Sequence, residues 1–145
     1  EIQRMFDWMD LHERDFAPEE FEVNTLRTWD NFFWWAELDQ IPARSVVAPV
    51  LFYDPIKDLR PILVDGRIVP EANRIRLETG AGKATIYLSP EIIDFDKRIS
   101  ISVNTARDIS DNIRPQIETI LDDARSRGDR QHPFWAKVEV DTGRR

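Results

Sequence analysis

The chain has 145 residues, of which 41% are hydrophobic and 10% aromatic, and it carries a net charge of −7. This length suits one domain of ordinary size, or one domain with an extra flanking element, and the apolar content argues against a fully disordered chain. No apolar run approaches the roughly 20 residues that a membrane-spanning helix needs. The negative charge would repel a phosphate backbone, so nucleic acid is a disfavoured partner.

The acidic residues are concentrated near the start of the chain. Residues 1–30 hold nine Asp and Glu against three Arg, a net charge of −6, and residues 31–145 together carry only −1. The chain has no Cys, which excludes disulfides, thiol nucleophiles and cysteine metal sites but does not define the compartment. Glu1 is not followed by a signal-peptide pattern, and we expect the sequence to be cut from a longer chain.

The first segment has apolar residues at helical spacing. Ile2, Met5, Phe6 and Met9 fall on one stripe, which predicts a helix over residues 2–14 that must pack on something. From Glu20 onward the pattern changes to short segments separated by Pro, Gly, Asn or Asp. Such a pattern is typical of a β-rich domain.

Several of these short segments alternate between apolar and polar residues. Phe21, Val23 and Thr25 indicate one strand, residues 32–38 indicate another, and Asp65-Gly66 predicts a tight hairpin turn. Three later strands each have one apolar face, and they are predicted at residues 74–78, 83–88 and 98–103, with a turn at 80–82. Alternation on one face only favours antiparallel sheets with one side on a core, as in a sandwich.

The last part of the chain predicts a helix followed by a strand. Pro115 suits the first position of a helix over residues 115–127, and Gly128 suits its left-handed cap. The apolar stripe of this helix would consist of Ile117, Ile120, Leu121 and Ala124. Alternation from Phe134 to Asp141 then predicts a final strand.

The sequence offers few groups for nucleophilic catalysis. The only histidines are His12 and His132, and no Gly-x-Ser-x-Gly motif is present, so we expect no serine hydrolase site within this chain. Both histidines are interpreted as structural residues. No catalytic residue is therefore assigned.

Paired carboxylates and metal ligands would be a second kind of chemistry. Four acids lie among aromatic or apolar neighbours, where burial would raise a carboxyl pKa, and these are Asp30, Glu91, Asp94 and Asp96. Turn and helix-start roles are the favoured interpretation for them. The chain lacks a calcium-loop pattern, a zinc-spaced His pair and a Gly-rich phosphate loop, so we predict no metal and no cofactor.

The aromatic cluster is the most informative feature. In one continuous strand over residues 32–38, Phe33 and Trp35 would share the face opposite to Phe32 and Trp34. We expect the Phe33 and Trp35 face to be covered by a helix or by a neighbouring domain, because large aromatics usually serve cores and interfaces. The alternative is a platform that stacks on sugars.

A dense polar stretch follows the second predicted helix. It contains Arg125, Arg127, Asp129, Arg130 and His132. We interpret it as a structural ion-pair cluster in which Arg side chains hold Asp carboxylates or helix-end carbonyls. Arg127-Gly128-Asp129 also spells an adhesion tripeptide, but Gly128 is needed as a helix cap.

Several runs resemble the C-terminal β-domain of planctomycete-type α/β-hydrolases, which are related to prolyl oligopeptidase and dienelactone hydrolase. The resemblance rests on residues 73–79, 84–97 and 99–104, and on the ending 121–136 with its Arg-Gly-Asp-Arg-Gln-His-Pro run. It covers most of the chain. The family usually has Asn-Gly where this sequence has Asn104-Thr105, and Asn104 is expected to adopt the left-handed conformation there.

The resemblance implies a chain that starts at the last helix of a catalytic domain, with residues 6–14 matching that helix. The family's Ser, Asp and His triad would then precede residue 1, and the protein would be exported. Domain boundaries follow as residues 1–18 for the terminal or linker helix and 19–145 for a β-sandwich accessory domain.

The fold we predict is mainly β, an immunoglobulin- or fibronectin-like antiparallel sandwich with a helix before it and one near its end. Its function would be non-catalytic, packing on the catalytic domain of the same chain and shaping substrate access. Phe6 and Met9 would contact that domain together with Phe33 and Trp35, and exposed aromatics would favour a homodimer.

Two alternatives stay open. In one, a carbohydrate-binding module stacks Trp29, Trp35 and Tyr87 on a polysaccharide. In the other, an autonomous hydrolase uses two carboxylates about 5 to 9.5 Å apart.

Overall fold

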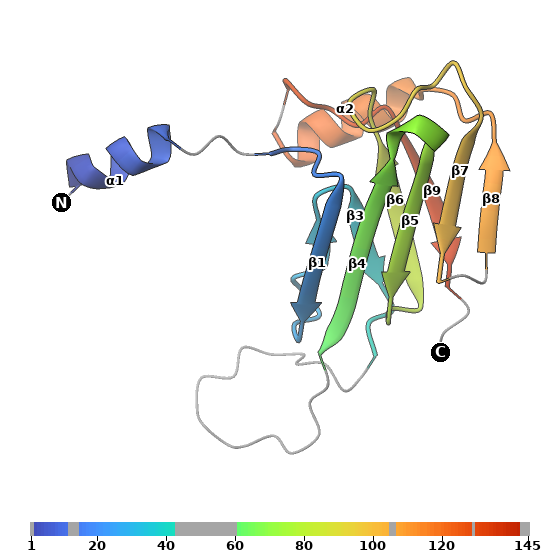
Figure 1. The fold of residues 1–145 in the computed structure, drawn as a ribbon, viewed down its shortest axis with the longest axis horizontal. Coiled ribbons are helices and arrows are strands. Elements are labelled where there is room, and N and C mark those ends of the chain that lie inside the picture. Colours follow the sequence, from blue (N-terminus) through green and yellow to red (C-terminus); the bar gives the residue numbers. More distant parts are fainter. Residues whose placement is uncertain (1, 12–14, 43–60, 105–106, 129, 143–145) are drawn as a thin grey trace.

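The computed structural model describes residues 2–11, 15–42, 61–104, 107–128 and 130–142. Over these residues the architecture is mainly β, with two sheets and two α-helices (Figure 1). His12 and Asp129, two of the polar residues weighed above, lie outside the described residues. The helices are α1 (Ile2–Asp10) and α2 (Ile117–Ser126), and the strands are β1 (Glu20–Thr25), β2 (Phe32–Phe33), β3 (Ala36–Asp39), β4 (Ile62–Val69), β5 (Arg74–Thr79), β6 (Lys83–Leu88), β7 (Ile99–Val103), β8 (Arg107–Asp111) and β9 (Ala136–Asp141).

The first sheet has the strand order β1-β4-β5-β7-β8. All neighbouring strands in it are antiparallel except β5 and β7, which run parallel. The expectation of purely antiparallel sheets is thus wrong at this pair. The reason is that β6 lies between β5 and β7 in sequence but belongs to the other sheet, so the chain returns to the first sheet in its original direction.

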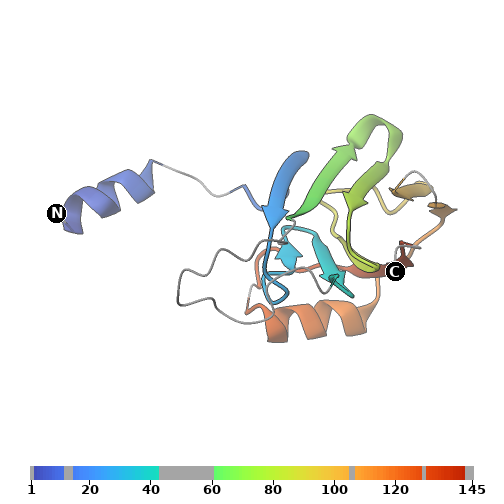
Figure 2. The same ribbon diagram turned by 90° about the horizontal axis from the view of Figure 1, so that it is seen from below.

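The second sheet has the order β2-β3-β6-β9 and is antiparallel throughout. The two sheets lie face to face, and α2 covers the outer side of the second sheet as a third layer (Figure 2). Residues 80–82 carry the chain from β5 in the first sheet to β6 in the second. Within this connection, Ala81 is fully buried.

The core is built by the alternation that the sequence predicted. Strands β5, β6 and β7 each bury every second residue, because one face of each strand meets the opposite sheet and the other does not. Ile75, Leu77, Ile86, Ile99 and Ile101 are fully buried in the resulting cluster. The predicted strands in this part of the chain are confirmed.

Residues 32–38 do not form one strand. β2 and β3 are the two arms of a hairpin in which Phe33 pairs with Ala36, so Trp34 and Trp35 form the turn. Trp34 has a positive φ of 49°, a conformation that local sequence patterns do not predict for a large aromatic residue. The hairpin sends Trp35 into the core, where it is fully buried.

Asp65-Gly66 lies in the middle of β4 and makes no hairpin turn. A side chain at Gly66 would collide with two aromatic rings, since a Cβ at this position would overlap the Phe21 ring and lie 2.9 Å from Trp35 Cζ2. Glycine is therefore required by packing, and the turn-forming dipeptide is overridden. The turn to β5 is made instead by a 3-10 turn, Pro70–Ala72, followed by Asn73 in the left-handed conformation.

Both predicted helices are present but shorter than expected, and Gly128 has the left-handed φ of 70° expected of a cap. The orientation of α2 differs from the prediction. Ile117 and Leu121 are 75% and 63% exposed, whereas Thr119 and Asp123 are buried.

α1 stands apart from the sheets in both views (Figures 1 and 2). Neither helix in the described part of the chain has the length and apolarity to cross a bilayer.

Candidate binding site beneath helix α2

A cavity of about 310 Å³ lies between α2 and the outer face of the second sheet. Strands of that sheet contribute Phe32, Glu37, Tyr87 and Lys137, and the helix contributes Thr119, Asp122, Asp123 and Ser126. Arg127, just after the helix, completes the lining. Tyr87 and Lys137 are direct neighbours across β6 and β9, and Glu37 lies on the adjacent strand β3.

Asp123 is the buried charge at the centre of the helix face. Its two carboxylate oxygens each accept a bond from the Arg127 guanidinium, at 2.5 Å from Nε to Oδ1 and 2.5 Å from Nη2 to Oδ2. The backbone N–H of Phe134 also donates to Oδ2 at 2.9 Å. This arrangement satisfies the carboxylate on both oxygens and ties α2 to the segment that leads into β9.

Arg127 is held in turn by its surroundings. Its guanidinium lies 4.2 Å from the centre of the Phe134 ring, and Nη2 donates to the backbone carbonyl of His132 at 3.1 Å. The polar stretch around residue 127 predicted Arg side chains that hold Asp carboxylates or helix-end carbonyls. Arg127 does hold the Asp123 carboxylate, but the carbonyl it binds belongs to the loop after the helix. Arg127 therefore serves as a fixed wall of the cavity.

The sheet side of the cavity is organised around Tyr87. Its hydroxyl donates to Glu37 Oε2 at 2.6 Å, and its ring packs against Phe134 and Phe32 at centroid distances of 5.1 and 5.5 Å. Burial raises the pKa of the Tyr87 hydroxyl well above its ordinary value, and the bond to Glu37 raises it further. Tyr87 is thus a protonated donor to Glu37 throughout the physiological pH range.

The structure separates the residues predicted to bind. Trp35 is fully buried and Phe33 is 8% exposed, so neither lies on a surface where it could stack on a sugar or contact another domain. The expectation that both side chains are covered is confirmed, but they are covered inside the core and not by a helix or another domain, so the expected domain contact through them is wrong. Tyr87 lines the cavity.

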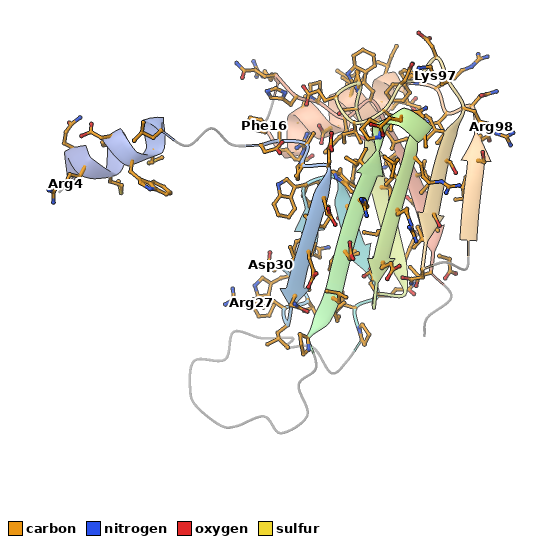
Figure 3. All side chains as sticks on the ribbon, in the orientation of Figure 1. Arg4, Phe16, Arg27, Asp30, Lys97 and Arg98 are labelled. Atoms are coloured by element: carbon orange, nitrogen blue, oxygen red, sulfur yellow. The ribbon has the colours of Figure 1, made fainter. Side chains whose placement is uncertain are left out.

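Trp29 is 46% exposed but does not line the cavity. Its sequence neighbours Arg27 and Asp30 lie toward the end of β1 that is distant from Phe16 (Figure 3). The platform of Trp29, Trp35 and Tyr87 is therefore not assembled on one surface. Phe6 and Met9 are both exposed on α1.

The other chemical candidates have structural partners. His132 Nδ1 lies 2.6 Å from Glu91 Oε1, and its ring stacks on Phe16 at 4.4 Å. A side-chain hydrogen bond from Lys97 holds the pKa of Asp94 below its ordinary value, which is the opposite of what a general acid needs. Within the described ranges, no three His, Asp or Glu side chains are grouped so that they could hold a metal ion.

Sequence reasoning missed Glu37, Asp122, Asp123 and Lys137. A single strand over residues 32–38 places Glu37 on the face of Phe33 and Trp35. A helix that buries its apolar stripe turns Ile117 and Leu121 inward instead of Thr119 and Asp123. A usable signal was Thr119 and Asp123 at i and i+4, which share one polar face of the helix. Only the packing of α2 shows that this face points inward.

Comparisons of the chain with protein-family models, with curated proteins and with solved structures returned no match.

Proposed function

We propose that this chain is a non-catalytic accessory domain of a serine hydrolase, and that it packs on the catalytic domain of the same protein through α1. The observation that carries the proposal is the exposed apolar stripe of α1. Ile2, Met5, Phe6 and Met9 all lie on this stripe and are all exposed. Exposed apolar side chains gathered on one helix mark a surface that another body covers.

The fold is consistent with such a role. Two sheets around one core give a rigid body, and we propose that the sandwich is of the immunoglobulin- or fibronectin-like type. The described residues hold no catalytic constellation that would compete with this function: His132 is paired with Glu91, and the cavity carboxylate Asp123 is engaged by Arg127. Phe6 and Met9 then remain as the residues that contact the catalytic domain.

Two measurements on the chain and its gene test the proposal. The 145-residue chain is assayed with an activated ester and with a chromogenic peptide amide, and we expect no turnover above the spontaneous rate. Sequencing the gene upstream of Glu1 should show a hydrolase domain. Turnover by the chain alone, or an upstream frame without a hydrolase domain, would contradict the proposal.

The docking itself is tested in the longer protein. Phe6→Gln with Met9→Gln removes two members of the stripe, and Arg4→Gln alters the same helix away from the stripe as the matched control. Small-angle scattering should show a larger radius of gyration for the double variant and no change for the control. An unchanged radius in the double variant would show that α1 does not hold the two domains together.

The alternative of a carbohydrate-binding module loses its stacking platform, because Trp35 is buried. One part of that alternative keeps support, since Tyr87 lines a cavity of ligand size.

A further inference from the structure

We infer that the cavity between α2 and the second sheet binds a small neutral polyhydroxyl ligand, a single sugar ring being the form that fits best. The inference is independent of the proposed docking through α1. It rests on the unusual orientation of α2, on the fixed geometry of the cavity wall, and on the balance of donors and acceptors in that wall.

The orientation of α2 is unfavourable for a helix that serves only to cover a sheet. Two of its three large apolar side chains, Ile117 and Leu121, are exposed, whereas Thr119 and Asp123 are buried and Ile120 is partly buried. Turning the helix to bury Ile117 and Leu121 would gain the free energy of apolar burial. Departures from local patterning of this kind concentrate at functional sites.

Four side chains of the cavity wall are held in place before any ligand arrives. Arg127 holds Asp123, and Tyr87 holds Glu37. Because these side chains are already ordered, binding a ligand would not cost the entropy of ordering them. The volume of about 310 Å³ lies at the low end of the roughly 300–1,000 Å³ of ligand pockets, so the ligand is small.

The wall is rich in hydrogen-bond acceptors. Tyr87 uses only Oε2 of Glu37, and in the described part of the chain neither Glu37 Oε1 nor the Asp122 carboxylate accepts a hydrogen bond. The hydroxyls of Thr119 and Ser126 donate to Gln116 and to the Asp123 carbonyl, which leaves their oxygens as acceptors. A complementary ligand must therefore bring several donors.

A ligand that brings several donors could be an ammonium compound or a neutral compound with several hydroxyls, and the charge of the wall distinguishes between them. An ammonium compound would meet Lys137 and Arg127 in the same wall, and these cations offset two of the three carboxylates. A neutral ligand with several hydroxyls avoids this repulsion and can also accept a bond from Lys137. The partly exposed Phe32 ring offers an apolar surface for the C–H face of a sugar.

The test is titration of the intact chain with glucose, galactose, mannose and N-acetylglucosamine, followed by calorimetry and by NMR shifts of the backbone amides of β6 and α2. We expect saturable binding of at least one sugar. Asp122→Asn and Glu37→Gln should each weaken it by about tenfold, because each removes a charged acceptor. Asp39→Asn is the matched control on the same face of β3 outside the cavity, and it should leave binding unchanged.

Asp122 is exposed on α2, so Asp122→Asn should preserve the fold, and a thermal melt checks this. Ethylammonium and inorganic phosphate are titrated in parallel as charged probes. The inference is overturned if no sugar saturates, if Asp122→Asn and Glu37→Gln bind as the parent does, or if only a charged probe binds.

Discussion

Gly66 shows how a single residue decides the packing of the core. Its position in β4 is next to the rings of Phe21 and Trp35, which pack edge to face at a centroid distance of 5.1 Å. Both rings occupy the space that a Cβ would take. The residue is thus glycine because of two distant aromatic side chains, although the Asp-Gly dipeptide predicts a turn.

Replacing this glycine should be destabilising. Gly66→Ala places a methyl group against two buried rings and should lower the free energy of unfolding by about 1–3 kcal/mol, measured by chemical denaturation. Gly80→Ala is the comparison, because its Cβ would be 3.1 Å from Ile62 Cγ2, a milder contact. An equal loss of unfolding free energy in both variants would show that contact with the Phe21 and Trp35 rings does not cause the destabilisation.

Asp123 provides a second test at the scale of one residue. Asp123→Asn breaks the paired bond to Arg127 inside the fold and should cost about 3 kcal/mol. Its neighbour Asp122 is exposed on the same helix, and Asp122→Asn should change the unfolding free energy by less than about 0.5 kcal/mol. Chemical denaturation of the two variants under the same conditions measures both unfolding free energies. Similar curves would contradict the structural role of Asp123.

At the scale of elements, Asn73 joins the turn after β4 to the segment that precedes β7. It has a positive φ of 46°, its Nδ2 donates to the carbonyls of Asp94 and Arg98 at 2.8 and 3.2 Å, and its Oδ1 accepts from the Asp94 N–H at 2.8 Å. One side chain thus fixes where the chain returns to the first sheet.

Two substitutions separate the conformational role of Asn73 from its hydrogen bonds. Asn73→Gly keeps the left-handed backbone and loses the side-chain bonds, whereas Asn73→Ala loses both. Both should destabilise the protein, and Asn73→Ala should do so by about 1 kcal/mol more. Unfolding by urea measures the difference, and equal losses would show that the backbone conformation carries no cost.

The ion pair between Lys83 and Glu139 joins β6 to β9 at 2.7 Å and predicts a pH dependence. The hydrogen bond lowers the pKa of Glu139 from 4.5 and raises that of Lys83 from 10.5. The ion pair therefore stabilises the folded protein at pH values between the ordinary pKa values of these two side chains. It is lost as the pH falls through the folded-state pKa of Glu139, or rises through that of Lys83.

A double-mutant cycle with Lys83→Met and Glu139→Gln measures this coupling. We expect a favourable coupling energy at about pH 7 and none in strong acid or strong base. The pair is exposed, so the coupling is small. A coupling energy that stays constant across the whole pH range would show that the contact is not electrostatic.

For the whole molecule, α1 is separate in both sequence and structure. The acidic N-terminal segment carries it, and its apolar residues are absent from the core cluster. We therefore expect the sheets to fold without it.

Deleting residues 1–11 tests this independence. The unfolding free energy should change by less than about 0.5 kcal/mol, while binding of a hydrophobic fluorescent dye should fall because the exposed stripe is gone. The deletion keeps Phe16, which stacks on His132. A large loss of stability would mean that α1 contributes to the fold of the sheets.

The elements whose signal is local could be predicted from the sequence alone. Alternation at period two identified β5, β6 and β7, apolar spacing identified both helices, and Gly128 marked a helix end. A strand or helix that buries one face has apolar residues at a regular spacing, so its pattern is visible within a few neighbouring residues.

Tertiary packing, and no local pattern, sets which sheet each strand joins, where Trp35 lies and which face of α2 is turned inward. The bond from Tyr87 to Glu37 joins residues 50 positions apart, and Gly66 is required by rings from two other segments. Such contacts depend on segments that are distant along the chain, and no local pattern encodes them. The candidate cavity joins one helical segment, residues 119–127, to strands that are distant from it along the chain, and for this reason only Tyr87 could be anticipated from the sequence as a binding residue within it.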